Sequence, residues 1–262
     1  MIYKAILLDK HDASVPMDNE GVTSRESPSA APGIPLEVAD GGTVPHGGRR
    51  DWIYERIRRG VMTGEYPAGM RLNEIRLAQS FNVSRVPLRE AFHTLERDGF
   101  IDQEPRRSAV VTAWTPQRVD ELFDVRLGLE IEATAVATRH RSPEAVEALR
   151  DVVAAEHLAS TEGRMLDLAE TSARFHTEIV AITGNQLMSR LMAQIAQRMT
   201  WLFYMTSARG PEQACVEHLE IVEAIASGNE ALARSIAHAH IEKGRQPSLN
   251  VLSLGSPADQ RE

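Results

Sequence analysis

The chain has 262 residues, of which 42% are hydrophobic and 25% are charged, a composition typical of globular proteins with room for two modest domains. No stretch approaches the roughly 20 consecutive apolar residues of a membrane-spanning helix, which excludes an integral membrane protein. A single cysteine, Cys215, excludes an internal disulfide framework and a multi-cysteine zinc finger. We therefore expect a cytoplasmic protein.

Charge is distributed unevenly along the chain. The formal net charge is −8, yet residues 49–114 carry twelve arginines against nine acidic residues. A locally basic module is thus attached to an acidic body. This pattern indicates a polyanionic partner, although an uneven surface charge without such a partner also fits it.

The first 48 residues differ from the rest of the chain. They contain 5 of the 13 prolines and 6 of the 17 glycines, and residues 24–48 show neither helical nor strand periodicity. Such a segment cannot bury enough apolar surface to fold alone, so residues 1–48 are expected to be a disordered leader. Both Met1 and Met17 are candidate start residues.

A helix-turn-helix with a short hairpin is predicted over residues 49–114. Helical spacing of apolar residues begins at Asp51 and ends near Thr63. The chain then offers a short helix over 74–81 after the capping residue Asn73, a tight turn at Asn82, a helix over 85–97 that ends at Gly99, and strands over 100–103 and 109–112.

The second of these paired helices has an outward face suited to DNA. Arg85 and Arg89 are one helical turn apart near its N-terminus, the end of a recognition helix that enters the major groove. The Ser84 hydroxyl can hold a phosphate, and Val86 lies on the same outward face. Arg106 and Arg107 occupy the tip of the hairpin, where a wing reaches the DNA backbone. Surface ion pairs with Glu90, Glu96 and Asp98 are the alternative role for these arginines.

This region resembles the winged helix-turn-helix of GntR-family bacterial transcription regulators over about 65 residues. The resemblance rests on the run from Pro67 to Gly99, which includes Arg71 and the specific core Ser84-Arg85-x-Pro87-x-Arg89-Glu90-Ala91. It implies DNA contacts for Arg71, Ser84, Arg85, Val86, Arg89, Arg106 and Arg107. One difference from the family pattern is Arg106-Arg107-Ser108 at the position where the wing usually reads Asn-Arg-Gly.

Residues 115–246 are predicted to form an antiparallel all-helical bundle, which makes the whole chain mostly α. Thr115-Pro116 and Ser142-Pro143 each provide an N-cap followed by proline at the first helical position. The expected helices cover 117–140, 143–160, 163–183, 185–207, 211–227 and 229–244. Residues 247–262 are expected to be a flexible tail.

Three histidines occupy inward positions on three different predicted helices. His176, His218 and His240 each fall on an apolar stripe, so a bundle core could bring their imidazoles together as ligands of zinc or a similar divalent ion. Isolated core histidines that bond to backbone carbonyls would produce the same pattern.

The bundle sequence resembles the FCD effector domain of the FadR-type branch of the same family over about 125 residues. Matching pieces include Glu121-Leu122-Phe123, Phe175-His176, Gly184-Asn185, and the runs that begin at His218 and His240. The resemblance implies that His176, His218 and His240 hold a divalent metal, that Ser172 stands where the family has a fourth ligand, an aspartate, and that the effector is a small organic acid. Arg126, Ser172 and Asn185 are the candidate effector-binding residues, and an Arg126–Glu130 structural pair is the alternative role for Arg126.

These features together predict a homodimeric, ligand-responsive transcription regulator, more specifically a repressor that binds a palindromic operator in double-stranded DNA. Two other functions are compatible with parts of the sequence. One is a metal-dependent hydrolase built on the three histidines, although no His-Glu-x-x-His motif occurs. The other is a winged helix that contacts a protein partner and not DNA.

Overall fold

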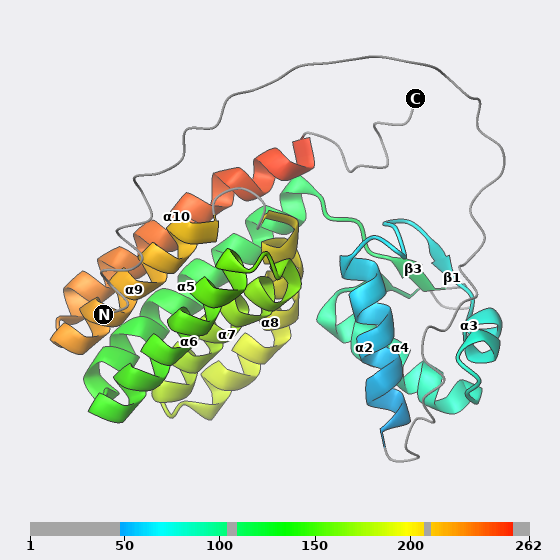
Figure 1. The fold of residues 1–262 in the computed structure, drawn as a ribbon, viewed down its shortest axis with the longest axis horizontal. Helices are drawn as coiled ribbons and strands as arrows, with labels where there is room; N and C mark the ends of the chain where they lie inside the picture. The colour runs from blue at the N-terminus through cyan, green and yellow to red at the C-terminus, as the bar shows by residue number, and fades with distance from the viewer. Residues whose placement is uncertain (1–47, 104–108, 207–210, 254–262) are drawn as a thin grey trace.

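The computed structural model describes residues 48–103, 109–206 and 211–253. Figure 1 shows two bodies side by side, a small N-terminal head and a larger bundle of long helices. The head contains α2 (Arg49–Met62), β1 (Arg71–Leu72), α3 (Glu74–Ser80), α4 (Arg85–Asp98), β2 (Ile101–Asp102) and β3 (Ala109–Val111). The bundle contains α5 (Pro116–His140), α6 (Pro143–Thr161), α7 (Met165–Ile182), α8 (Gln186–Thr206), α9 (Pro211–Ser227) and α10 (Glu230–Ser253).

The head is a winged helix-turn-helix. Asn73 caps α3, because its side-chain oxygen accepts from the backbone N–H groups of Ile75 and Arg76. Asn82 adopts a left-handed backbone with φ 50°, which makes the tight turn into α4. Leu88 of α4 is fully buried in the core of the head. The predicted helix-turn-helix is therefore confirmed.

The sheet of the head has one strand, β1, that was not predicted from the sequence. Its order is β1-β3-β2 and both pairings are antiparallel, with Arg71 opposite Val110 and Ile101 opposite Val111. β2 and β3 are the two predicted strands, each shorter than expected. β1 has only two residues, too few for a periodic signal. The wing tip, residues 104–108, lies outside the described residues, and with it Arg106 and Arg107.

The bundle follows the predicted helix pattern closely. Thr115 and Ser142 cap α5 and α6 through side-chain hydrogen bonds, and proline follows each cap. The apolar stripes of the helices build two cores, one centred on α6, α7 and α9 and another on α5, α7 and α8. None of the helices of the described residues is long and apolar enough to cross a membrane.

The expected tail that begins at residue 247 is wrong for its first seven residues. α10 continues past Pro247 to Ser253. Leu249 and Leu252 pack against the bundle core, and Ser248 is buried and donates to the carbonyl of Gly244. Pro247 cannot donate the backbone hydrogen bond of a helix interior, and the apolar packing of the residues that follow it offsets this loss. Residues 254–262, the rest of that tail, lie outside the described residues, as do residues 1–47 of the expected leader.

Helix α8 joins the two bodies. Trp201 of α8 is buried in the core of the head, where it stacks on Phe100 with ring centroids 5.4 Å apart and meets Trp114 edge-on at 5.7 Å. Arg58 of α2 makes a second bridge: its Nη1 lies 2.9 Å from a carboxylate oxygen of Glu170, and its Nε bonds Gln197. A movement of α8 would therefore disturb these contacts with the head.

Candidate nucleic-acid interface and metal centre

The start of α4 presents the predicted DNA-contacting residues on the surface of the head. Ser84 takes the N-cap position, and its hydroxyl makes no capping hydrogen bond. Arg85 and Arg89 have 54% and 57% of their side chains exposed, and Val86 is 67% exposed. Arg71, in β1, is exposed as well. The free first-turn N–H groups and these side chains form a surface that a phosphate backbone and base edges can meet.

One carboxylate holds both arginines. Oε2 of Glu74, the first residue of α3, lies 2.9 Å from Nε of Arg89 and 3.4 Å from Nη2 of Arg85. Glu90, Glu96 and Asp98 were the expected alternative partners, but the carboxylate that pairs with Arg85 and Arg89 is Glu74. This pairing orients the two guanidinium groups without burying them. Because exposed ion pairs are weak, a DNA phosphate can compete for the same donors.

The three bundle histidines meet in the core. His176, His218 and His240 come from α7, α9 and α10, and one ligand nitrogen of each lies within 4.8 Å of the others. Their side chains are 3%, 2% and 11% exposed. The alternative of isolated core histidines bonded to carbonyls does not describe this cluster.

A separate glutamate holds the Nδ1 atom of each imidazole. The Nδ1 to carboxylate distances are 2.8 Å for His176 and Glu130, 2.7 Å for His218 and Glu156, and 2.9 Å for His240 and Glu217. A carboxylate on Nδ1 fixes the ring orientation and leaves Nε2 as the lone-pair donor. This arrangement is typical of histidines that bind metal.

The residues fit a divalent ion on two further grounds. Within the described residues, His218 Nε2 is buried and has no hydrogen-bond partner, an unusual state that a metal would relieve. The side chain of Glu156 is fully buried, and its hydrogen-bond partners, Ser172 and His218, carry no charge of their own when the imidazole is neutral. A nearby cation would compensate this buried carboxylate.

Burial keeps two of the imidazoles neutral. It lowers the pKa of His176 to about 4, against the opposing effect of Glu130, and lowers that of His240 to about 3. The carboxyl of Glu217 is also affected: burial opposes ionisation, but hydrogen bonds from His240, Gln213 and Lys243 lower its pKa to about 2. Neutral imidazoles beside ionised carboxylates are the form in which histidine binds metal.

Arg126 and Ser172 are already engaged by buried glutamates. Nε of Arg126 lies 2.6 Å from Oε1 of Glu130, and the guanidinium is only 2% exposed. Ser172 donates to Glu156, which in turn holds His218. The Arg126–Glu130 pair was one of the expected roles of Arg126. Glu156 and Glu217 were not predicted to hold the histidines, because His218 and His240 lie 62 and 23 residues away from them.

A cavity of about 210 Å³ opens beside the histidines. Phe123, Phe203 and Leu168 contribute apolar surface to it, and its polar lining includes Arg126, Ser172, Gln213, Glu217, His218, His240 and Lys243. Asn185, the third candidate effector-binding residue, does not belong here. Its side-chain oxygen accepts from the N–H groups of Leu187 and Met188 at the start of α8, so it is a helix cap.

Comparison with known families gives two matches that together cover most of the described chain. Residues 49–111 match the family described as bacterial regulatory proteins, gntR family. Residues 121–243 match the FCD domain. The first range is the winged helix-turn-helix and the second contains all three histidines.

Similar proteins are named as regulators. The chain is 30% identical over 227 residues to the putative HTH-type transcriptional regulator RmpR of Mycobacterium gastri, covering 77% of this chain and 80% of that protein. It is 25% identical over 193 residues to the probable D-xylose utilization operon transcriptional repressor of Paenarthrobacter nicotinovorans, covering 73% and 83%.

A solved structure shows the same fold. A putative GntR transcriptional regulator from Rhodococcus sp. RHA1 superposes with a TM-score of 0.65 at 20% identity, over 78% of this chain and 98% of that one. The fold, the exposed recognition helix and the two family matches agree with one another. The chain belongs to the GntR family, in the FadR-type branch with an FCD domain, and is a DNA-binding transcription regulator.

Proposed function

We propose that the chain is a cytoplasmic, homodimeric repressor whose bundle binds a divalent metal and senses a small organic acid. The observation that carries this proposal is the unpartnered, buried Nε2 of His218. This atom belongs to a cluster of three imidazoles, two of which, His218 and His240, line the cavity. His176, His218 and His240 would hold the ion. When bound, the metal would supply a Lewis-acid position for an oxygen of the effector.

With a divalent ion bound, the cavity would favour an anionic effector. Lys243 and Arg126 line it, but each is already paired with a glutamate, so the ion would supply the uncompensated positive charge. Ser172 also lines the cavity, although its hydroxyl is donated to Glu156. The small volume of about 210 Å³ limits the ligand to a compact acid.

On the DNA side, we expect a palindromic operator. A twofold dimer presents two recognition helices related by its axis, so each would read one half-site. Arg85, Val86 and Arg89 would contact bases or phosphates, and Arg71 and Ser84 the backbone; Arg106 and Arg107 remain the expected wing contacts. The D-xylose operon relative is named a repressor, which supports the same direction of control here.

The effector would act by preferring one arrangement of head and bundle. A ligand shifts a conformational equilibrium only by its difference in affinity between the two states. α8 provides a physical connection, because Phe203 lies beside the cavity and Trp201, two residues away, is packed in the core of the head.

Metal analysis and thermal unfolding test the proposal. Zinc added to chelator-treated protein is expected to bind at one equivalent per chain and to raise the unfolding midpoint, because a ligand of the folded state stabilises it. In a screen of lactate, citrate and benzoate, at least one acid should raise the midpoint further only when zinc is present. No stabilisation by any divalent ion would refute the metal site. If an acid stabilises the protein equally with and without zinc, the metal has no role in sensing that acid.

The hydrolase alternative is not favoured. Each of the three glutamates around the histidines is engaged on an imidazole Nδ1, so none of them is placed as a free general base for a metal-bound water.

The other alternative is a winged helix that contacts a protein partner and not DNA. The salt dependence of DNA binding distinguishes it from a DNA-reading head. Phosphate contacts make the logarithm of the affinity for DNA fall linearly with the logarithm of salt concentration.

A further inference from the structure

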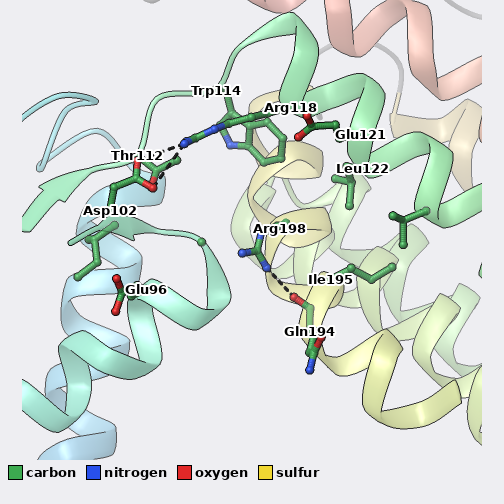
Figure 2. A pocket seen from close by; sticks show the side chains of 13 residues that line it. Glu96, Asp102, Thr112, Trp114, Arg118, Glu121, Leu122, Gln194, Ile195 and Arg198 are labelled. Carbon is green, nitrogen blue, oxygen red and sulfur yellow. Dashed lines mark hydrogen bonds and ion pairs between the residues drawn. The ribbon is translucent and has the colours of Figure 1, made fainter. Parts of the chain in front are cut away.

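A second cavity lies between the head and the bundle, away from the histidines. Its volume is about 400 Å³, within the range of small-molecule sites. Figure 2 shows Thr112 and Asp102 from the head on one side, Arg198, Gln194 and Ile195 from α8 on the other, and Trp114 and Arg118 above. We call this the interdomain cleft.

Two donors that line the cleft have no partner among the described residues. The Thr112 side chain is buried, with 6% of the residue exposed, and its Oγ1 makes no hydrogen bond. The indole Nε1 of Trp114 is likewise buried and unbonded. A buried donor without an acceptor destabilises the folded chain. Two such groups on one cavity indicate that an acceptor from outside the chain belongs there.

Arg198 adds a positive charge to the same cavity. Its Nη1 and Nη2 donate to the carbonyls of Gln194 and Arg97, and no carboxylate of the described residues lies within ion-pair distance of it. The guanidinium packs over Gly99, where a Cβ would fall 2.5 Å from Nε, so the glycine is needed for this approach. Burial lowers the pKa of Arg198, against the opposing effect of the Asp98 and Asp102 carboxylates.

None of the acidic residues that line the cleft forms an ion pair with Arg198. Asp102 is paired with Arg118 at 3.3 Å, and the carboxylate of Glu121 accepts from the neutral amide of Gln117. Glu96 has 42% of its side chain exposed and lies at the edge of the cavity. Ile101, Leu122, Val125 and Ile195 supply the apolar part of the lining. The cavity therefore combines the unpaired cation Arg198, two neutral donors and an apolar surface, with the carboxylates of Glu96 and Glu121 elsewhere on its lining.

We propose that the interdomain cleft binds a small carboxylate with an apolar body, whose oxygens accept from Arg198, Thr112 and Trp114. The cation comes from the bundle and Thr112 from the head, so the bound molecule would bridge the two and restrain the angle between them. This site is separate from the metal-associated cavity, and the proposal does not depend on metal binding.

Isothermal titration calorimetry on the full chain, treated with chelator, tests the proposal. The probes are benzoate and octanoate, each compared with its neutral amide. We expect at least one of the two acids to bind and its amide to bind at least about tenfold more weakly, because the Arg198 contact is charge-assisted. Arg198→Gln should weaken binding of that acid by about tenfold or more, and Thr112→Val by about threefold to tenfold. Arg198→Lys should restore part of the affinity.

Two control variants locate the binding. Arg190→Gln makes the same change two turns earlier on α8, at an exposed residue outside the cleft, and should leave the affinity unchanged. Lys243→Gln lies on the bundle cavity and should also have no effect. An acid that is weakened by Lys243→Gln but not by Arg198→Gln occupies the bundle cavity and overturns the proposal. Absence of binding by both acids overturns it too. Zinc binding, measured separately, reports on the metal site alone.

Discussion

The head and the bundle use arginine and glutamate in opposite ways. In the head, Arg85 and Arg89 share the single carboxylate of Glu74, and all three side chains are at least 30% exposed. In the bundle, Arg126 and Glu130 are 2% and 5% exposed and are joined by two hydrogen bonds. Water screens the first group and leaves it free to exchange partners. The second group is held in place, because breaking a buried pair leaves an uncompensated charge.

The difference matches the two tasks. A surface that reads DNA must release its own ion pairs when a phosphate or base arrives, so weak and shared pairing is an advantage. A metal centre needs ligands that are already oriented, so each imidazole has its own carboxylate. The variants below test this division, from the largest expected effect to the smallest.

Removal of a histidine should have the largest effect. His218→Ala deletes one of three metal ligands and is expected to weaken zinc binding more than about 100-fold, because loss of a supporting partner alone costs 10–100-fold. Competition with a fluorescent chelator measures the affinity. His238→Ala is the matched control, because His238 lies on α10 like His240 but is exposed and does not belong to the cluster. Equal zinc affinity in both variants would contradict the site.

Loss of either recognition arginine should come next. Arg85→Ala and Arg89→Ala are each expected to weaken binding to DNA selected by the protein from a random duplex pool by about 10–100-fold, the value of one bidentate base contact. Gel shift at fixed salt measures the change. Arg97→Ala, at the far end of α4, removes an arginine of similar exposure and is the control. If neither Arg85→Ala nor Arg89→Ala changes the affinity, α4 is not the reading helix.

The head shows how far local sequence signals reach. Asn73, Asn82 and Gly99 act within a few residues of their own positions, so the caps and turns could be read from the chain and are confirmed by the backbone. Glu74 could not be identified as the partner of Arg85 and Arg89, because the pairing depends on how α3 packs on α4. Strand β1 was missed for a related reason: its two residues acquire strand geometry only by pairing with β3.

The bundle shows the limit more clearly. Helical spacing placed His176, His218 and His240 on inward stripes, and the fold brings them together. Glu156 was not singled out, although it is fully buried, because its partners Ser172 and His218 lie 16 and 62 residues away. Asn185 shows the opposite case: a family motif suggested a ligand contact, and in the structure its side chain caps α8, outside the lining of the bundle cavity.

Glu156→Gln tests the support of the metal centre. The amide keeps the size of the side chain and can still bond Ser172 and His218, but it removes the buried charge. Zinc affinity should fall about tenfold, at the lower end of the effect of a supporting partner. The unfolding midpoint of the metal-free protein should rise, because a buried carboxylate without a cation is destabilising. Glu147→Gln, exposed on the same helix α6, should change neither quantity. A metal-free midpoint that falls would contradict this charge argument.

Glu74→Gln should have the smallest effect and an unusual sign. Without the carboxylate, Arg85 and Arg89 no longer have to break an ion pair within the protein before they bind a phosphate. The affinity for scrambled duplex DNA should therefore rise by up to about fivefold, which corresponds to the free energy of one exposed ion pair. The guanidinium groups also lose their common orientation, so the ratio of affinities for selected and scrambled DNA should fall. Glu90→Gln removes an equal charge from an exposed position of α4, beside Arg89 in the sequence, without changing this pairing. If Glu90→Gln raises the affinity equally and both variants keep the ratio, net charge alone explains the gain and Glu74 does not orient the arginines.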